Sequence, residues 1–130
     1  MARFFNVVVF NKVINTGVTY YSDPQFDDLL GSADVVTLQA IVDGTPGATT
    51  VTAQYQTANE SSAIAGEWAT DANFPAAQPA PTSATDVPKS AMARNNPEAK
   101  MGDKGRVAVS CSAQVGVPVR VIACGRRSGA

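Results

Sequence analysis

The chain has 130 residues, a formal net charge of −1 and no histidine. That length predicts a single domain, residues 1–130, large enough to bury a core without a metal or a disulfide. The lack of histidine excludes Ser-His-Asp and Cys-His catalysis and histidine metal sites. The sequence also contains no P-loop and no H-E-x-x-H motif. We therefore expect a non-enzymatic protein with no catalytic residues, no metal and no cofactor.

The aliphatic residues favour strands over helices. The chain holds 16 Val, 4 Ile and 11 Thr but only 3 Leu. Branched side chains of this kind fit a pleated sheet better than a helix. An all-helical bundle is not expected.

The N-terminal region predicts two strands. Phe4 to Phe10 is a continuous apolar run of strand length, and Asn15-Thr16-Gly17 predicts a turn before a returning strand from Val18 to Tyr21. The apolar run is too short for a signal peptide or a membrane span. We therefore expect synthesis in a cytosol and no membrane contact.

A short acidic helical turn should follow. Ser22-Asp23-Pro24 predicts a capped helical start, and Gly31 predicts its end. Asp27 and Asp28 lie between them. Grouped carboxylates can bind calcium, but no D-x-D-x-D-G loop is present, so we interpret the cluster as a solvated acidic surface.

The centre of the chain predicts the clearest pair of strands. Residues Asp34–Asp43 alternate in polarity, and Thr49–Thr57 place Val51, Ala53 and Tyr55 on one face. A turn sequence, residues 44–47, joins the two runs. We predict an antiparallel hairpin with one dry face and one wet face, as in a sandwich or barrel layer.

Trp68 is the single tryptophan, in a short predicted strand at residues 67–70. We interpret it as a core or rim anchor. The alternative is a sugar-stacking platform, but no second exposed aromatic residue accompanies it.

Residues 72–104 have a different composition from the rest of the chain. Proline recurs there among small, polar and charged residues, at Pro75, Pro79, Pro81, Pro88 and Pro97. Such a segment buries little apolar surface and favours extended geometry. We expect an extended irregular arm that lies across a neighbouring subunit; a loose surface loop is the alternative.

The C-terminal region predicts a second hairpin, from Arg106–Ser112 and Val119–Cys124 around Val115-Gly116. This register places Cys111 opposite Arg120 and not opposite Cys124. Disulfide geometry would then be unfavourable, so we expect two free thiols.

Charge is unevenly distributed along the chain. Residues 1–88 carry a net charge of −7, and residues 89–130 carry +6. The simplest interpretation is that the two segments neutralise each other within the folded monomer. They could instead dock on a partner or on a second copy. Nucleic acid binding is not expected, because the basic half lacks aromatic residues that stack on bases.

Together these elements predict an all-β, antiparallel β-sandwich of jelly-roll or Ig-like type, with a long Pro-rich arm. The sequence resembles small β-sandwich structural proteins of tailed bacteriophages, of the head decoration or cement type. The likeness rests on the apolar N-terminal strand, Thr19-Tyr20-Tyr21-Ser22-Asp23-Pro24, Ala33-Asp34-Val35-Val36-Thr37-Leu38-Gln39-Ala40, the T-V-T-A-Q-Y strand and the R-V-A-V-S and V-P-V-R-V-I-A-C-G-R strands. The Pro-rich middle does not share it.

The resemblance implies a virion protein on the capsid exterior that bridges subunits of the major capsid protein. It also implies a homo-oligomer, with a trimer favoured. We expect the partner contacts at Phe4, Phe5, Pro79, Pro81, Arg126 and Arg127. A self-assembling coat protein and a carbohydrate-binding or tail adhesion module are the alternatives.

Overall fold

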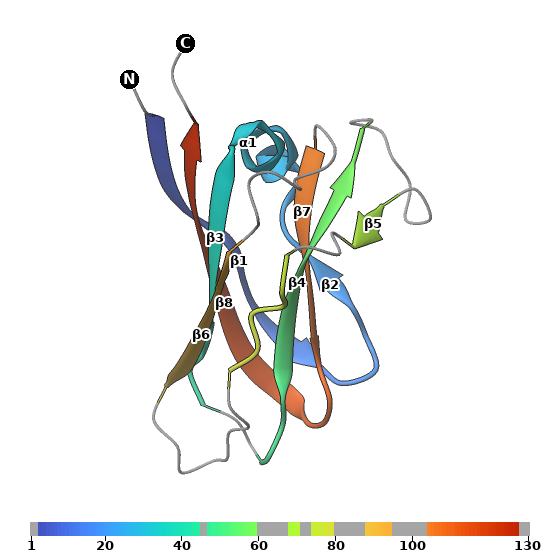
Figure 1. The fold of residues 1–130 in the computed structure, drawn as a ribbon. Helices are drawn as coiled ribbons and strands as arrows, with labels where there is room; N and C mark the ends of the chain where they lie inside the picture. The colour runs from blue at the N-terminus through green and yellow to red at the C-terminus, as the bar shows by residue number, and fades with distance from the viewer. Residues whose placement is uncertain are drawn as a thin grey trace.

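Two antiparallel four-stranded sheets pack face to face in the computed structural model, which describes residues 3–44, 47–59, 68–70, 74–79, 88–94 and 104–127 (Figure 1). The first sheet has the strand order β1-β8-β3-β6 and the second β2-β7-β4-β5. The predicted antiparallel β-sandwich is confirmed. The first sheet contains β1 (Arg3–Asn15), β8 (Val115–Arg127), β3 (Val35–Val42) and β6 (Lys89–Arg94), and the second contains β2 (Tyr20–Tyr21), β7 (Lys104–Cys111), β4 (Val51–Ala58) and β5 (Ala69–Thr70).

The strand pairing is nested. Strand β1 pairs with β8, β2 with β7, β3 with β6 and β4 with β5, so the second half of the chain folds back along the first. Two further ladders, β3 with β8 and β4 with β7, complete the sheets. This double Greek key of eight strands is the jelly-roll arrangement, and it settles the choice left open between jelly-roll and Ig-like topology.

The core lies between the sheets and is built from alternating residues. Strand β3 buries Val36, Leu38, Ala40 and Val42, as its alternation predicts. Strand β4 buries Val51, Ala53 and Tyr55 from the opposite sheet. Period-two patterning alone therefore identifies which face of each strand points inward.

The predicted hairpins are wrong in their pairing. The connections from β1 to β2, β3 to β4 and β7 to β8 each cross from one sheet to the other. Two strands paired in a hairpin point their apolar faces the same way and leave them open to solvent. Crossing to the opposite sheet brings the two apolar faces together, and the sequence of a turn does not distinguish these outcomes.

The cysteines are free, as expected, but for a different reason. Cys111 lies opposite Val51 in the second sheet, and Cys124 lies opposite Asn6 and Thr37 in the first. The predicted register of Cys111 against Arg120 is therefore wrong. The two thiols belong to different layers of the sandwich.

The helical turn forms where it was predicted. Asp23 caps a 3-10 segment, η1 (Pro24–Phe26), by accepting a hydrogen bond from the backbone N–H of Gln25 at 3.0 Å. The short helix α1 (Asp27–Ser32) follows and extends past Gly31. No helix among the described residues is long and apolar enough to cross a membrane.

The described parts of the Pro-rich segment belong to the sandwich. Phe74 is 2% exposed, and its ring stacks on Tyr55 with centroids 4.8 Å apart. Ala77 and Ala53 exchange two backbone hydrogen bonds of 2.9 Å. Residues 89–94 form β6, an edge strand that the composition did not predict. The remaining residues of the expected arm lie outside those described.

We expect Phe74→Ala to lower the free energy of unfolding by about 3–5 kcal/mol, because it removes a buried aromatic ring from the core. Gln78→Ala is the control, because it removes only an exposed side-chain hydrogen bond to Thr52 and should cost about 1 kcal/mol or less. Urea unfolding measures both variants. Equal and small losses would show that residues 74–79 are not anchored in the core.

Candidate functional site

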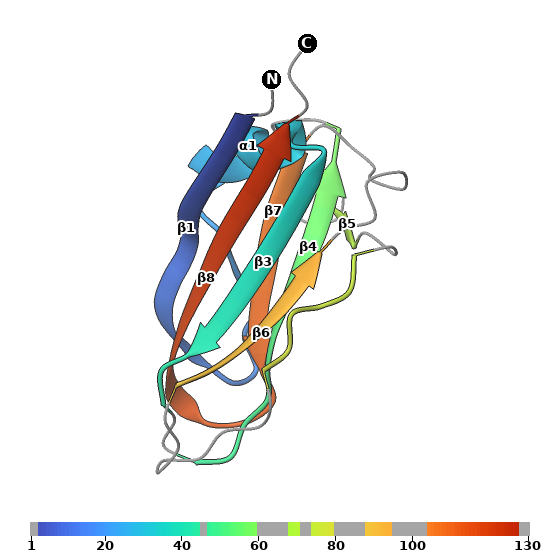
Figure 2. The same cartoon turned by 60° about the vertical axis from the view of Figure 1, so that its left-hand side comes forward.

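The described residues hold no cluster of three or more His, Cys, Asp or Glu that could bind a metal ion. The candidate site lies instead on the solvent-facing side of the β1-β8-β3-β6 sheet. Figure 2 shows this sheet with its four strands side by side. We call this surface the outer face.

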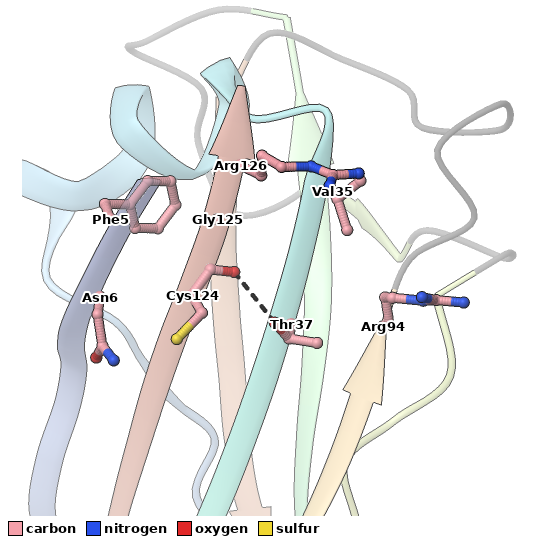
Figure 3. Close-up of a pocket in the computed structure, with 8 residues that line it drawn as sticks. All are labelled: Phe5, Asn6, Val35, Thr37, Arg94, Cys124, Gly125 and Arg126. Atoms are coloured by element: carbon pink, nitrogen blue, oxygen red, sulfur yellow. Dashed lines mark hydrogen bonds between the residues drawn. The ribbon is translucent and has the colours of Figure 1, made fainter. Parts of the chain in front are cut away.

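Side chains on the outer face align in rows across the strands. One row contains Asn6, Cys124, Thr37 and Arg94, one residue from each strand (Figure 3). The hydroxyl of Thr37 donates a hydrogen bond of 3.4 Å to the carbonyl oxygen of Cys124 within this row. This row and its neighbours Val35 and Arg126 line a shallow hollow of about 640 Å³.

The next row is apolar at three of its four positions. It contains Val8, Ile122, Gln39 and Met92. Val8 is 45% exposed and Met92 is 65% exposed, while Ile122 is half-buried. Open apolar side chains gathered on one sheet face mark a surface suited to contact with another protein.

The charge of this sheet has one sign. Its four strands contain no Asp or Glu and hold seven of the ten basic residues of the chain: Arg3, Lys12, Lys89, Arg94, Arg120, Arg126 and Arg127. Arg120 pairs with Asp43, just beyond β3, at 3.2 Å. Arg94 and Arg126 are exposed beside the hollow. By register, Arg94, Arg120 and Arg126 lie on the outer face, whereas Lys12 and Lys89 lie opposite the inward-facing Val119 and Val42. The outer face therefore carries three basic residues and an apolar row.

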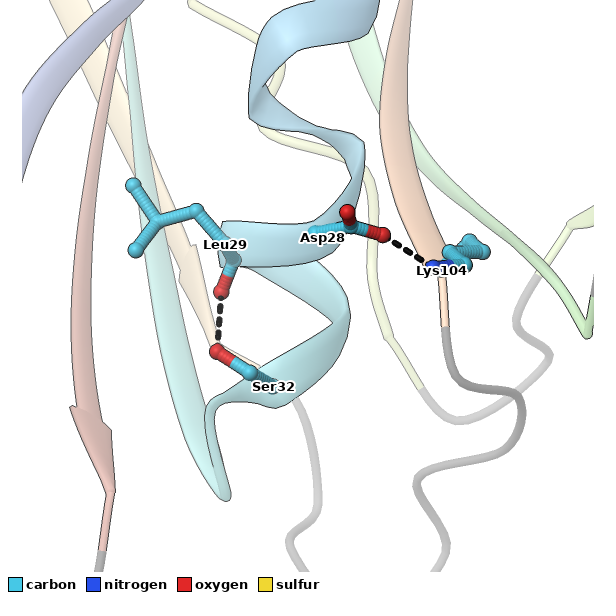
Figure 4. Close-up of polar contacts among 4 residues, drawn as sticks. All are labelled: Asp28, Leu29, Ser32 and Lys104. Atoms are coloured by element: carbon cyan, nitrogen blue, oxygen red, sulfur yellow. Dashed lines mark hydrogen bonds and ion pairs between the residues drawn. The ribbon is translucent and has the colours of Figure 1, made fainter. Parts of the chain in front are cut away.

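Carboxylates gather elsewhere, around α1. Lys104 of β7 forms an ion pair with Asp28, and the Ser32 hydroxyl donates to the Leu29 carbonyl at 2.9 Å within the helix (Figure 4). Burial raises the pKa of Asp27; Asp28 and Asp23 raise it further, against the opposing charges of Arg106 and Lys104. Among the described residues, this acidic group thus lies beside the basic residues Lys104 and Arg106 of β7 and not in the strands of the first sheet.

Trp68 is buried, in agreement with its interpretation as an anchor. The guanidinium of Arg106 lies 4.6 Å from the centroid of its ring and 3.9 Å from that of Tyr21. Arg106 also donates a hydrogen bond of 2.7 Å to Gln56. This arrangement occupies one face of the indole ring and leaves Trp68 poorly placed as a sugar platform.

The structure separates the residues expected to contact partners. Arg126 is exposed on the outer face, whereas Phe5 is half-buried against Gly125 and the core. Phe4 and Arg127 enter the β1-β8 ladder opposite Arg126 and Arg3. Pro79 is buried, which removes it from the candidate surface. Pro81 lies outside the described residues.

Sequence reasoning missed Met92 and Arg94 as surface residues. The alternation of β8 does put Ile122 on the face of Arg120 and Cys124, and Val8 belongs to the N-terminal strand expected at an interface, but neither was selected as a contact residue. Met92 and Arg94 could not be found, because β6 lies in a stretch whose composition predicts irregular structure.

No family model and no curated protein matches the chain. A solved structure from Bacillus endospore appendages, described as a novel family of disulfide-linked pili, superposes with a TM-score of 0.45 and 10% sequence identity. The superposition covers 99% of this chain and 89% of that chain. A likeness of this degree carries no inference about function.

We expect Asp27→Asn to raise the melting temperature at pH 7. A carboxyl whose pKa is higher in the folded state costs stability once the pH rises through its titration range. The gain should vanish at about pH 3, where the unfolded carboxyl is protonated too. Asp28→Asn is the control: it loses the ion pair with Lys104 and should give no gain. Thermal unfolding at both pH values measures this, and a gain independent of pH would contradict it.

Proposed function

We propose that this protein is a non-enzymatic structural protein of virions, a decoration or cement protein on the capsid exterior. It would bind the outside of a phage head and bridge subunits of the major capsid protein. The observation that supports the proposal best is the outer face, where an open apolar row crosses a sheet whose strands carry only positive charge.

The partner that fits this surface is an acidic protein surface on the shell. Protein interfaces combine an apolar centre with a polar rim. Val8, Ile122 and Met92 would supply the centre, and Arg94 and Arg126 the charged rim. Complementary charge orients the two surfaces and speeds their encounter, while contacts repeated over a symmetric lattice add up to firm binding.

The scaffold supports the same role by analogy of fold. Jelly rolls of eight strands occur in viral capsid and lectin domains as well as in cupins, so architecture alone does not select one of them. The fold provides a stiff sheet with a broad solvent-facing side. A docking protein requires only a stiff, exposed surface of this kind from its fold.

A self-assembling coat protein is the second candidate, supported by the same architecture. It differs in the mass that light scattering would measure for the purified protein: megadalton particles for a coat protein and a small oligomer for a decoration protein. A carbohydrate-binding module has less support, because Trp68 is buried beneath Arg106.

We expect Arg94→Ala combined with Arg126→Ala to weaken binding to DNA-free phage heads by roughly tenfold, as lost charge contacts of this kind do. The loss should shrink at high salt, where charge contributes less. Lys104→Ala is the matched control, because it removes a positive charge away from the outer face. Co-sedimentation with a panel of expanded heads measures the binding. If the double variant binds as tightly as the parent at low and high salt, the outer face is not the docking surface.

A further inference from the structure

The four edge strands of the sandwich differ greatly in length. Strands β2 and β5 have 2 residues each, β6 has 6 and β1 has 13. An edge strand presents unpaired N–H and C=O groups that can pair with another chain. Proteins usually prevent such pairing by keeping edge strands short or by placing proline or charged residues on them. Strand β6 has Pro88 just before it and charged residues at both ends. The long edge of β1 is therefore the one most open to pairing with another chain.

Within the described parts of the chain, no strand pairs with the free edge of the first part of β1. For Arg3 to Val8, the described residues provide no backbone hydrogen bonds apart from those of the ladder with β8. The first contact on the free side is at Val9, whose carbonyl accepts from the N–H of Asp23 at 3.3 Å. A register shift between Val8 and Phe10 then bends the strand. The straight, open edge is therefore Arg3–Val8.

The sequence of this open edge is suited to pairing. Residues 4–8, Phe-Phe-Asn-Val-Val, contain no charge and no proline. Phe5 and Val7 are only half-buried against the core, and Val8 is 45% exposed. A neighbouring strand would cover side chains on both sides of the sheet. The partner must itself be an extended, largely uncharged strand.

A second copy of the same segment fits this requirement. Directly opposite residues in an antiparallel pair share one face of the sheet. A two-fold axis perpendicular to the sheet at Asn6 therefore places Asn6 opposite Asn6, Phe5 opposite Val7 and Phe4 opposite Val8. This register uses the whole straight edge, stops at the bulge and keeps the two Arg3 residues at opposite ends.

We propose that β1 pairs antiparallel with β1 of a second copy through residues 4–8, joining two first sheets into one continuous eight-stranded sheet. The contact is isologous and therefore closes as a dimer, in place of the expected trimer. The axis keeps both outer faces on the same side, which doubles the basic surface. The pairing does not depend on the proposed function.

Charge substitution at the axis tests the pairing. Asn6 and Asn11 are both exposed residues of β1, but Asn11 lies beyond the bulge. Asn6→Lys places two like charges directly opposite each other and should raise the dimer dissociation constant by roughly fivefold or more. Asn11→Lys, the matched control, should leave it unchanged. Sedimentation velocity over a range of concentrations measures the dissociation constant, with twice the 13.5 kDa chain mass expected for the parent dimer.

A mixed sample makes the test specific to the two-fold axis. Asn6→Asp alone should also weaken the dimer, while an equal mixture of the Asn6→Lys and Asn6→Asp chains should restore it through opposite charges. Unchanged melting temperatures show that the variants are folded. A parent protein that is monomeric or trimeric, equal effects of Asn6→Lys and Asn11→Lys, or no recovery in the mixture would each overturn the proposal.

Discussion

The rest of this structure depends on one interaction, the packing of the apolar side of one sheet against the apolar side of the other. Strands β3 and β4 show it most simply: each is wet on one side and dry on the other, and they are joined by a short connection. Their apolar sides can face each other only if the connection passes from one sheet to the other. Repeating this crossing at both ends of the chain produces the nested pairing of the jelly roll.

The same constraint determines what the molecule can offer to a partner. With the inner sides committed to the core, only outer sides, edges and loops remain. The outer side of the second sheet is largely polar and carries the stack of Tyr21, Arg106 and Trp68. The first sheet has an exposed apolar row on its outer face, strands with basic but no acidic residues, and a long free edge at β1. The face and the edge share Asn6 and Val8, but docking would use their side chains and dimerisation their backbone groups, so the two contacts can coexist.

Local patterns predicted the strands and their inward faces but not their partners. Alternation identified Val51, Ala53 and Tyr55 as core residues, and Asp23 identified the start of the helical turn, because these depend on nearby residues alone. Pairing depends on contacts between distant residues, such as β3 with β8, for which the sequence of a turn holds no information. Strand β6 was missed because its small and charged residues form a strand only beside β3. The basic surface required the fold, since Arg94 and Arg126 meet on one face only after pairing.

Hydroxyl-radical footprinting of the protein, free and bound to purified phage heads, tests the docking surface most directly. Met92 is 65% exposed on the outer face and reacts readily as a thioether, while Tyr21, 38% exposed, reports on the opposite sheet. The account predicts that binding protects Met92 and Val8 from oxidation and leaves Tyr21 as reactive as in the free protein. Protection of Tyr21 with Met92 still fully reactive would contradict it and assign docking to the second sheet.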